Sequence, residues 1–178
     1  MGNCSNRAVV ISRKKDGQVM FKKILVAYDG SDGSKIALNK AAEVAAKFGA
    51  EVTLLTVGGP LMGSATAGLK VPQMNESEYD RLADEGIAWL ARQNIAARKQ
   101  IRWVDPADVI LHEAGAGNYD LIVMGHRGIS SSIRRDAGML GSVAIKVLNR
   151  AACSVLVARP DDLAQTVESD SDPLSPAL

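Results

Sequence analysis

The sequence has few aromatic residues, almost no net charge and no long apolar run. Aromatic residues make up 4% of the 178 positions, too few for a surface on which the bases of single-stranded nucleic acid would stack. A formal net charge of +1 argues against a protein that binds nucleic acid through a broad basic surface. No apolar run approaches the roughly 18 residues of a membrane span, and the N-terminal region has no signal-peptide core. We therefore expect a cytoplasmic protein that binds neither nucleic acid nor membrane.

Cysteine and histidine are equally scarce, and they do not form a recognisable metal motif. Cys4 and Cys153 are far apart, and neither His112 nor His126 follows them at the spacing of zinc ligands. The sequence therefore predicts no structural zinc site. We expect Cys153 to be a buried small apolar side chain and His126 to be an exposed loop residue.

Both ends of the chain differ in composition from the middle. Regular patterning begins near Met20, so residues 1–19 are predicted to be a flexible extension. Residues 161–178 are acidic, contain Pro and Ser and lack periodicity, which is typical of a disordered tail. Residues 20–160 are then predicted to form one domain, long enough to bury a substantial core.

Within residues 20–160, short apolar runs alternate with helical patterns. The runs "KKILVAYD", "AEVTLLTV", "DLIVMG" and "CSVLVARP" are typical of strands buried on both faces, whereas the charges of "RKQIRWV" indicate an edge strand or a half-exposed strand face. Helix starts are indicated at Ser31 or Ser34 and at Asp105, which Pro106 follows. This alternation predicts a Rossmann-like α/β fold: an open, doubly wound, five-stranded parallel sheet with helices on both faces.

Residues with binding chemistry follow two of the predicted strands. In an open parallel sheet, ligands bind beyond the carboxyl ends of the strands. Asp29 follows the first strand, and "GHRG", residues 125–128, follows the fourth. Glycines let the backbone approach a ligand closely, and Gly141 and Ser142 open the last helix, where backbone N–H groups favour a phosphate. The sequence therefore predicts a phosphate site made in two pieces, one at each end of a long loop.

Other phosphate-binding and catalytic motifs are absent from the sequence. No Gly-Lys-Ser/Thr follows a glycine-rich loop, which excludes a Walker-type nucleotidase, and no Gly-x-Gly-x-x-Gly follows the first strand, so a nicotinamide or flavin site is not supported. No serine occupies a nucleophile elbow. Since no residue stands out as a general base, binding is favoured over catalysis.

Six segments in this order resemble the universal stress protein family: "KKILVAYDGSDGS", "GAEVTLLTV", "DPADVILHEA", "YDLIVMGHRG", "GSVAIKVLNRA" and "CSVLVARP". The resemblance extends from Phe21 to Pro160 and implies the fold of adenine-nucleotide α-hydrolase-like proteins. It also implies a role in stress response or signalling, with at most slow ATP hydrolysis. The nucleotide-binding branch of the family has Gly, two residues, Gly, nine residues, then Gly followed by Ser or Thr.

This chain matches the first half of that pattern and departs from the second. Gly125 and Gly128 have the required spacing, but Gly141 follows Gly128 after twelve residues rather than nine. Nine residues would lead to Gly138, which Met139 follows, so we assign Gly141 because "GSVAIKVL" matches the start of the family's last helix. Closing the longer loop costs only ~0.3 kcal/mol more. The insertion therefore puts the geometry of the site in question, not its entropy, and we expect the loop to be mobile without ligand.

The resemblance implies a site for ATP, ADP or AMP, with Mg²⁺ carried by the phosphates. Asp29 would lie near the ribose or adenine, the backbone of Val57 would contact the base, and Met124 would wall the base pocket. The glycines after the fourth strand would admit the ribose and phosphates, and the start of the last helix would hold the phosphates. Arg127 would either contact a phosphate or belong to a solvated loop face. The expected binding residues are Asp29, Val57, Met124, Gly125, Arg127, Gly128, Gly141, Ser142 and Val143.

The last strand suggests how the chain assembles. It is apolar and is predicted at a sheet edge, where an unpaired strand invites pairing with another chain. Members of the family use this strand for a two-fold dimer, so the resemblance implies a homodimer through Cys153 to Arg159.

Two alternatives remain open. The first is a dimeric interaction protein of the same fold whose longer loop has closed the nucleotide site. The second is an enzyme like the ATP-pyrophosphatases of the wider superfamily. That enzyme would need a Ser-Gly-Gly start after the first strand, where this chain has "DGSDGS", residues 29–34.

Overall fold

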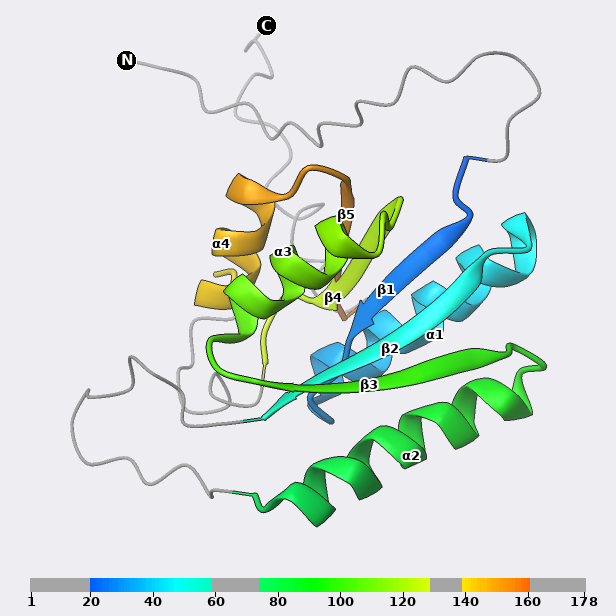
Figure 1. The fold of residues 1–178 in the computed structure, drawn as a ribbon. Coiled ribbons are helices and arrows are strands. Elements are labelled where there is room, and N and C mark those ends of the chain that lie inside the picture. The colour runs from blue at the N-terminus through cyan, green and yellow to red at the C-terminus, as the bar shows by residue number, and fades with distance from the viewer. Residues whose placement is uncertain (1–19, 59–73, 129–138, 161–178) are drawn as a thin grey trace, which may run out of the picture.

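The computed structural model describes residues 20–58, 74–128 and 139–160. Strands and helices alternate along these residues (Figure 1), as the sequence predicts. The strands are β1 (Lys23–Ala27), β2 (Glu51–Gly58), β3 (Ala97–Trp103), β4 (Leu121–Gly125) and β5 (Ser154–Ala158). The helices are α1 (Asp32–Phe48), α2 (Glu76–Arg92), α3 (Pro106–Ala116) and α4 (Ser142–Arg150).

The strands form one parallel sheet in the order β3-β2-β1-β4-β5. Strand β1 lies at the centre, and its residues Ile24, Leu25 and Val26 are completely buried. A strand covered on both faces needs apolar side chains on both, which explains its continuous apolar sequence. The charged strand β3 lies at one edge and β5 at the other. The predicted open, doubly wound parallel α/β fold and the edge position of β3 are both confirmed.

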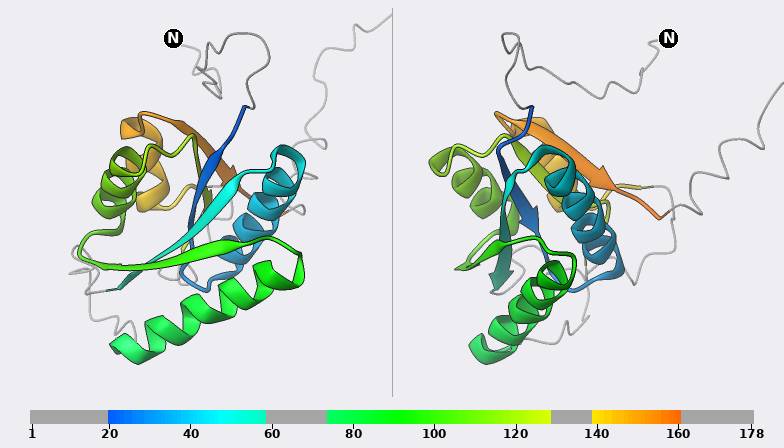
Figure 2. Two further views of the ribbon diagram at one scale, coloured as in Figure 1. Left: turned by 45° about the vertical axis from the view of Figure 1, so that its right-hand side comes forward. Right: turned by 90° about the vertical axis from the view of Figure 1, so that its right-hand side faces the viewer.

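Helices cover both faces of this sheet (Figures 1 and 2). On one face, Leu90 of α2 and the small side chains of α1 share a core cluster with Val26 of β1. On the other face, Ile110 of α3 and Val147 of α4 share a second cluster with Leu25. Val26 and Leu25 are neighbours in the chain, and they serve opposite clusters because successive side chains of a strand point to opposite faces.

Side-chain caps determine where three of the helices begin. Ser31 caps α1, where its Oγ accepts a hydrogen bond from the N–H of Ser34 at 3.2 Å. Asn75 caps α2 as part of a capping box. Asp105 caps α3 ahead of Pro106. The helix start predicted at Asp105 is confirmed, and of the two predicted caps of the first helix, Ser31 and Ser34, the structure has Ser31. Both Ser31 and Asp105 supply the oxygen acceptor that a first turn lacks.

Some sequence predictions concern residues outside the described ranges. These are the flexible extension over 1–19, the disordered tail over 161–178, and the mobility of the loop between Gly128 and Gly141, of which residues 129–138 are not described. Within the described residues, no helix is both long enough and apolar enough to cross a membrane.

Candidate functional site

The carboxyl ends of β1 and β4 lie side by side at the centre of the sheet. The connection that leaves β1 runs to β2 on one side of it, whereas the connection that leaves β4 runs to β5 on the opposite side. The two connections therefore diverge between β1 and β4. Open parallel sheets bind ligands at such a divergence. Asp29 follows β1, whereas Gly125 ends β4 and Gly128 comes just after it. These predicted site residues are therefore brought to one edge of the sheet.

Asp29 and Gly128 are in direct contact. The Asp29 carboxylate accepts hydrogen bonds through Oδ1 from the N–H of Ser31 at 3.0 Å and from its Oγ at 2.5 Å. Its other oxygen faces Gly128 so closely that a Cβ at position 128 would lie 2.6 Å from Oδ2. Because Ser31 holds one carboxylate oxygen, a larger residue at position 128 would displace the other. The glycine at position 128 is required for this close approach.

Two further glycines, Gly33 and Gly125, let the start of α1 pack against the end of β4. A Cβ on Gly33 would lie 2.5 Å from the carbonyl oxygen of Arg127, and a Cβ on Gly125 would lie 2.5 Å from the carbonyl carbon of Gly33. Backbone therefore packs directly on backbone here, which only glycine allows. Sequence reasoning missed Gly33 as part of this site. The repeated Asp-Gly-Ser of residues 29–34 was the signal that could have found it.

The two halves of the predicted phosphate site adjoin despite the longer loop. The N–H of Gly141 donates a hydrogen bond to the carbonyl of His126 at 2.8 Å. A Cβ on Gly141 would lie 3.5 Å from Cα of Arg127. In addition, Nε of Arg127 donates to the carbonyl of Met139 at 2.9 Å. The twelve residues between Gly128 and Gly141 thus leave their two ends in contact.

The first turn of α4 has the features of an anion-binding helix start. Its N-cap, Gly141, provides no side-chain hydrogen bond, and the first turn contains no acidic residue. A helix leaves its first N–H groups without intrahelical partners, and these groups carry the positive end of the helix dipole. Ser142 is exposed and adds a hydroxyl donor. The residues present therefore fit a phosphate.

The predicted apolar residues lie at the same edge on the α3 and α4 side of the sheet. Met124 in β4 is 5% exposed and belongs to the core cluster of that face. Val57, near the end of β2, and Val143, in the first turn of α4, are half-buried and pack against the same cluster. These three side chains form an apolar surface beside residues 125–128, which we call the glycine turn. A flat ligand bound there would need such an apolar wall.

The prediction that His126 is an exposed loop residue is wrong, because the side chain is 8% exposed. Its backbone N–H donates to the carbonyl of Ala158 at 2.9 Å, and its carbonyl accepts from Gly141. The residue thus extends the pairing of β4 with β5 beyond the strand and at the same time ties down the start of α4. Two backbone bonds to residues distant in the sequence, which no local pattern indicates, draw it into the structure.

Cys153 is only half-buried, although we expected it to be buried. Burial is nevertheless the main cause that raises the pKa of its thiol. A thiol with a raised pKa is a poor nucleophile near neutral pH, so this cysteine is not indicated as a reactive group.

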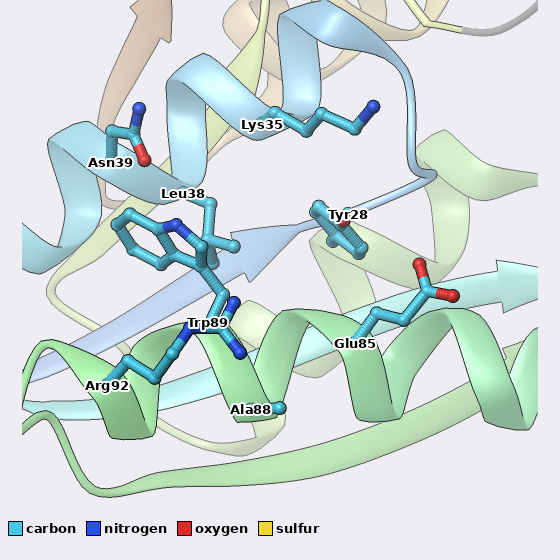
Figure 3. A pocket seen from close by; sticks show the side chains of 8 residues that line it. All are labelled: Tyr28, Lys35, Leu38, Asn39, Glu85, Ala88, Trp89 and Arg92. Atoms are coloured by element: carbon cyan, nitrogen blue, oxygen red, sulfur yellow. The ribbon is translucent and has the colours of Figure 1, made fainter.

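A groove of about 440 Å³ lies elsewhere, between α1 and α2 (Figure 3). Its lining includes Tyr28, which directly follows β1, and from there the groove extends between the two helices to Arg92 near the end of α2. Neither the glycine turn nor the first turn of α4 contributes to it. The groove is therefore distinct from the candidate site.

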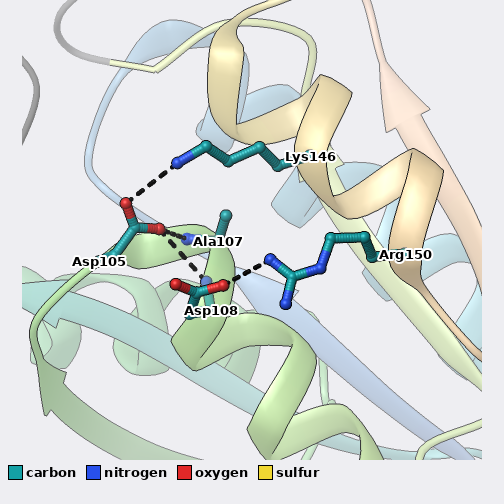
Figure 4. Close-up of polar contacts among 5 residues, drawn as sticks. All are labelled: Asp105, Ala107, Asp108, Lys146 and Arg150. Carbon is teal, nitrogen blue, oxygen red and sulfur yellow. Dashed lines mark hydrogen bonds and ion pairs between the residues drawn. The ribbon is translucent and has the colours of Figure 1, made fainter.

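Ion pairs between α3 and α4 hold the helix that carries the second half of the site (Figure 4). Asp105 accepts from Nζ of Lys146 at 3.2 Å, and Asp108 accepts from Arg150 at 2.6 Å. Asp105 also accepts from the N–H of Ala107 at 2.9 Å. Single pairs of this exposure contribute about 0–1 kcal/mol, so their effect is to orient α4 on α3 more than to stabilise the fold.

Residues 20–159 match the sequence model described as the universal stress protein family. The chain belongs to the universal stress protein family. Among its relatives, the universal stress protein YxiE of Bacillus subtilis is 36% identical over 151 residues, which are 79% of this chain and 100% of that protein. The family membership inferred from six sequence segments is thus confirmed.

Solved structures of universal stress proteins share the fold. One, in complex with cAMP, has a TM-score of 0.59 and 20% identity, and the match covers 78% of this chain and 97% of that one. Another, from Archaeoglobus fulgidus in complex with dAMP, has a TM-score of 0.57 and 22% identity, with 79% and 99% covered. At these identities the likeness shows the fold, and some universal stress proteins are thus known as nucleotide complexes.

Proposed function

We propose that this universal stress protein binds ATP, or another adenine nucleotide, at the carboxyl ends of β1 and β4. It would act as a nucleotide-dependent module in stress response or signalling. The observation that carries the proposal is the 2.8 Å hydrogen bond from the N–H of Gly141 to the carbonyl of His126. This bond joins the two halves of the predicted phosphate site, the phosphate cradle, despite the longer loop between them. The cAMP and dAMP complexes of other family members support adenine as the base.

In this proposal the N–H groups of Ser142 and Val143, with the Ser142 hydroxyl, hold the phosphates at the positive end of α4. Gly125 and Gly128 let the ribose and phosphates approach the backbone. Asp29 accepts a hydrogen bond from a ribose hydroxyl, since a carboxylate is an acceptor only.

The base would lie beside β2 and β4, against Met124 and the backbone of Val57. Arg127 donates through Nε to the Met139 carbonyl, so we assign its main role to joining the two halves of the cradle. The half-buried position of Val57 is compatible with contact to a flat ligand.

A divalent cation would bind through the phosphates and not in a protein cage. The described residues contain no group of three or more His, Cys, Asp or Glu side chains arranged to hold a metal. Mg²⁺ commonly keeps several waters and relies on substrate phosphates in nucleotide sites. We propose that hydrolysis is at most slow, since the proposed contacts bind and orient the nucleotide without supplying a general base.

Calorimetric titration of the nucleotide-stripped full chain with Mg-ATP tests the proposal. We expect saturable binding of about one nucleotide per chain and an affinity at least tenfold lower in Gly128→Ala, a loss of ~1.4 kcal/mol, because the added Cβ displaces Asp29. Gly115→Ala is the matched control. Gly115 lies in α3 with no atom within 4 Å of an added Cβ, and its substitution should leave the affinity unchanged.

Absence of both heat and thermal stabilisation at millimolar Mg-ATP would contradict the proposal. The interaction protein with a closed nucleotide site would then be favoured. Release of pyrophosphate from ATP at a turnover rate typical of enzymes would instead favour the ATP-pyrophosphatase-like alternative.

We further propose that the protein is a homodimer through the segment Cys153 to Arg159, which contains β5. Ser154 donates to Asp120, and the carbonyl of Ala158 accepts from His126, so these backbone groups face β4. The groups of the alternate residues then face outward, where a second chain can pair with them. We expect light scattering to give the mass of two chains, and one-chain mass for Val157→Pro. A one-chain mass for the wild type would overturn this part.

A further inference from the structure

The groove between α1 and α2 has an apolar floor and polar ends. Its volume of about 440 Å³ falls within the range of small-molecule sites. Leu38 of α1 is 3% exposed, and Tyr28 at the end of β1 is 6% exposed. The half-buried indole of Trp89 extends from α2 toward α1 and lies beside Leu38 (Figure 3). Leu38 and Tyr28 thus form the floor of the groove, and the partly exposed indole of Trp89 offers the flat surface on which an aromatic ring packs.

The two ends of the groove differ in charge. Toward one end, Lys35 and Glu85 approach from opposite helices (Figure 3), and Lys35 also lies 3.7 Å from Asp32. Two carboxylates therefore lie near one ammonium group, so this end has a net negative charge. Toward the other end lie Asn39 and Arg92, which are both exposed. This end thus has a net positive charge.

Arg92 is available to an external anion. No ion pair found among residues 20–58, 74–128 and 139–160 includes its guanidinium. A guanidinium presents a planar fork of N–H donors that matches a carboxylate in a bidentate arrangement. Asn39, on the opposite helix, lies on the other side of the Trp89 indole (Figure 3), so Arg92 is the group placed to recognise the anion. Arg92 also lies in the last turn of α2, where a positive charge interacts favourably with the helix dipole. Its charge can therefore stabilise the helix and also bind an anion.

We propose that this groove is a second binding site, for a small aromatic carboxylate. The ring lies against Trp89 and Leu38, and the carboxylate is held by Arg92. The site is separate from the proposed nucleotide site and does not depend on it.

The Tyr28 hydroxyl can donate a hydrogen bond to a polar substituent of the ligand at the acidic end of the groove. Burial, followed by the charges of Glu85 and Asp29, raises the pKa of Tyr28. The hydroxyl therefore stays protonated near neutral pH and donates a hydrogen bond. A hydroxyl or carbonyl group on the ring, at the side opposite the carboxylate, would meet it.

Titration of the ¹⁵N-labelled full chain with 2-naphthoate tests this site directly. The chain contains two tryptophans, so the spectrum has two indole N–H signals, and Trp103→Phe assigns them. We expect the Trp89 signal to shift saturably while the Trp103 signal stays in place. Arg92→Gln should weaken binding at least tenfold. Arg98→Gln is the matched control, because Arg98 lies on the edge strand β3 outside the groove, and should leave binding unchanged.

Two further measurements separate this site from non-specific association. The neutral isostere 2-naphthylmethanol should bind at least tenfold more weakly than 2-naphthoate if Arg92 recognises the carboxylate. Ala88→Glu should block binding without removing any packed side chain, because Ala88 is exposed in the groove lining. No shift at millimolar 2-naphthoate, equal shifts of both indole signals, or unchanged affinity in Arg92→Gln would each overturn the proposal.

Discussion

Helices α1 and α4 both begin beside the carboxyl ends of the central strands, yet their first turns are chemically opposite. Their N-cap backbones are almost the same, with φ −65° and ψ 160° at Ser31 and φ −66° and ψ 153° at Gly141. Ser31 supplies a cap oxygen and is linked to Asp29, and Asp32 adds an acid to the first turn of α1. Gly141 supplies no side-chain cap, and no acid follows it. The difference between the two helix starts therefore lies in their side chains.

This comparison suggests how a nucleotide would be oriented. In the first turn of α1 the Ser34 N–H already bonds to Ser31, and the carboxylates of Asp29 and Asp32 repel a phosphate. The first turn of α4 has the N–H groups and the helix dipole without a competing acid. Phosphates are therefore expected at α4, and the hydroxyl-bearing sugar is expected near Asp29. Two predictions test the contrast between these two helix starts, and a third concerns the start of α3.

The largest expected effect comes from making α4 resemble α1. Ser142→Asp places a carboxylate in the first turn of α4, where it should repel the phosphates and weaken Mg-ATP binding at least tenfold. The same charge should raise the free energy of unfolding by about 0.3–1 kcal/mol through the helix dipole. Calorimetry measures the first effect and urea denaturation the second. The neutral variant Ser142→Asn is the control, and equal Mg-ATP affinity in the two variants would place the phosphates elsewhere.

A smaller effect is expected from removing the cap of α1. Ser31→Ala deletes the acceptor for the Ser34 N–H and the hydroxyl that donates to Asp29. We expect the free energy of unfolding to fall by about 0.5–2 kcal/mol, measured by urea denaturation. Ser31→Thr retains a hydroxyl and should recover most of the loss. If Ser31→Ala is as stable as the wild type, packing alone determines where α1 begins.

The smallest effect concerns the helix start that links α3 to α4. Burial acts to raise the pKa of Asp105, but hydrogen bonds from Lys146 and from the N–H groups of Asp108 and Ala107 outweigh it, so the pKa is lowered. A carboxyl whose pKa is lower in the folded state stabilises the protein above its unfolded pKa of about 3.9. This stabilisation is lost as the pH falls through the folded pKa.

Asp105→Asn keeps the cap and removes the charge. The wild type should therefore exceed this variant in free energy of unfolding by up to about 1 kcal/mol near neutral pH. The difference should shrink on acidification below the unfolded pKa, as followed by urea denaturation at several pH values. A difference that stayed constant with pH would show that the Asp105 charge does not contribute.

Much of the fold was predictable because its signals are local. The apolar run of β1 indicated a buried central strand, and Ser31 and the Asp105-Pro106 pair marked helix starts through acceptors close to the N–H groups that they serve. The charges of β3 indicated an edge strand, since a charged side chain is tolerated there. Each of these inferences needs only a few neighbouring residues.

Features that depend on distant contacts were not predictable in the same way. The burial of His126 follows from backbone bonds to Ala158 and Gly141, and the role of Gly33 follows from its contact with Gly125. The groove beside Trp89 requires the relative position of two helices. None of these arrangements has a periodic or short-range signature in the sequence.

The sequence by itself determined the family, the order of strands and helices, and the candidate residues from Asp29 to Val143. Only the tertiary structure decided whether a loop three residues longer than the family pattern holds the two glycine segments apart in space. It does not, because Gly141 and Arg127 bond to backbone carbonyls on the far side of the loop. Spacing along a chain measures loop length, whereas the distance between the ends of a loop is set by the strands and helices that anchor them.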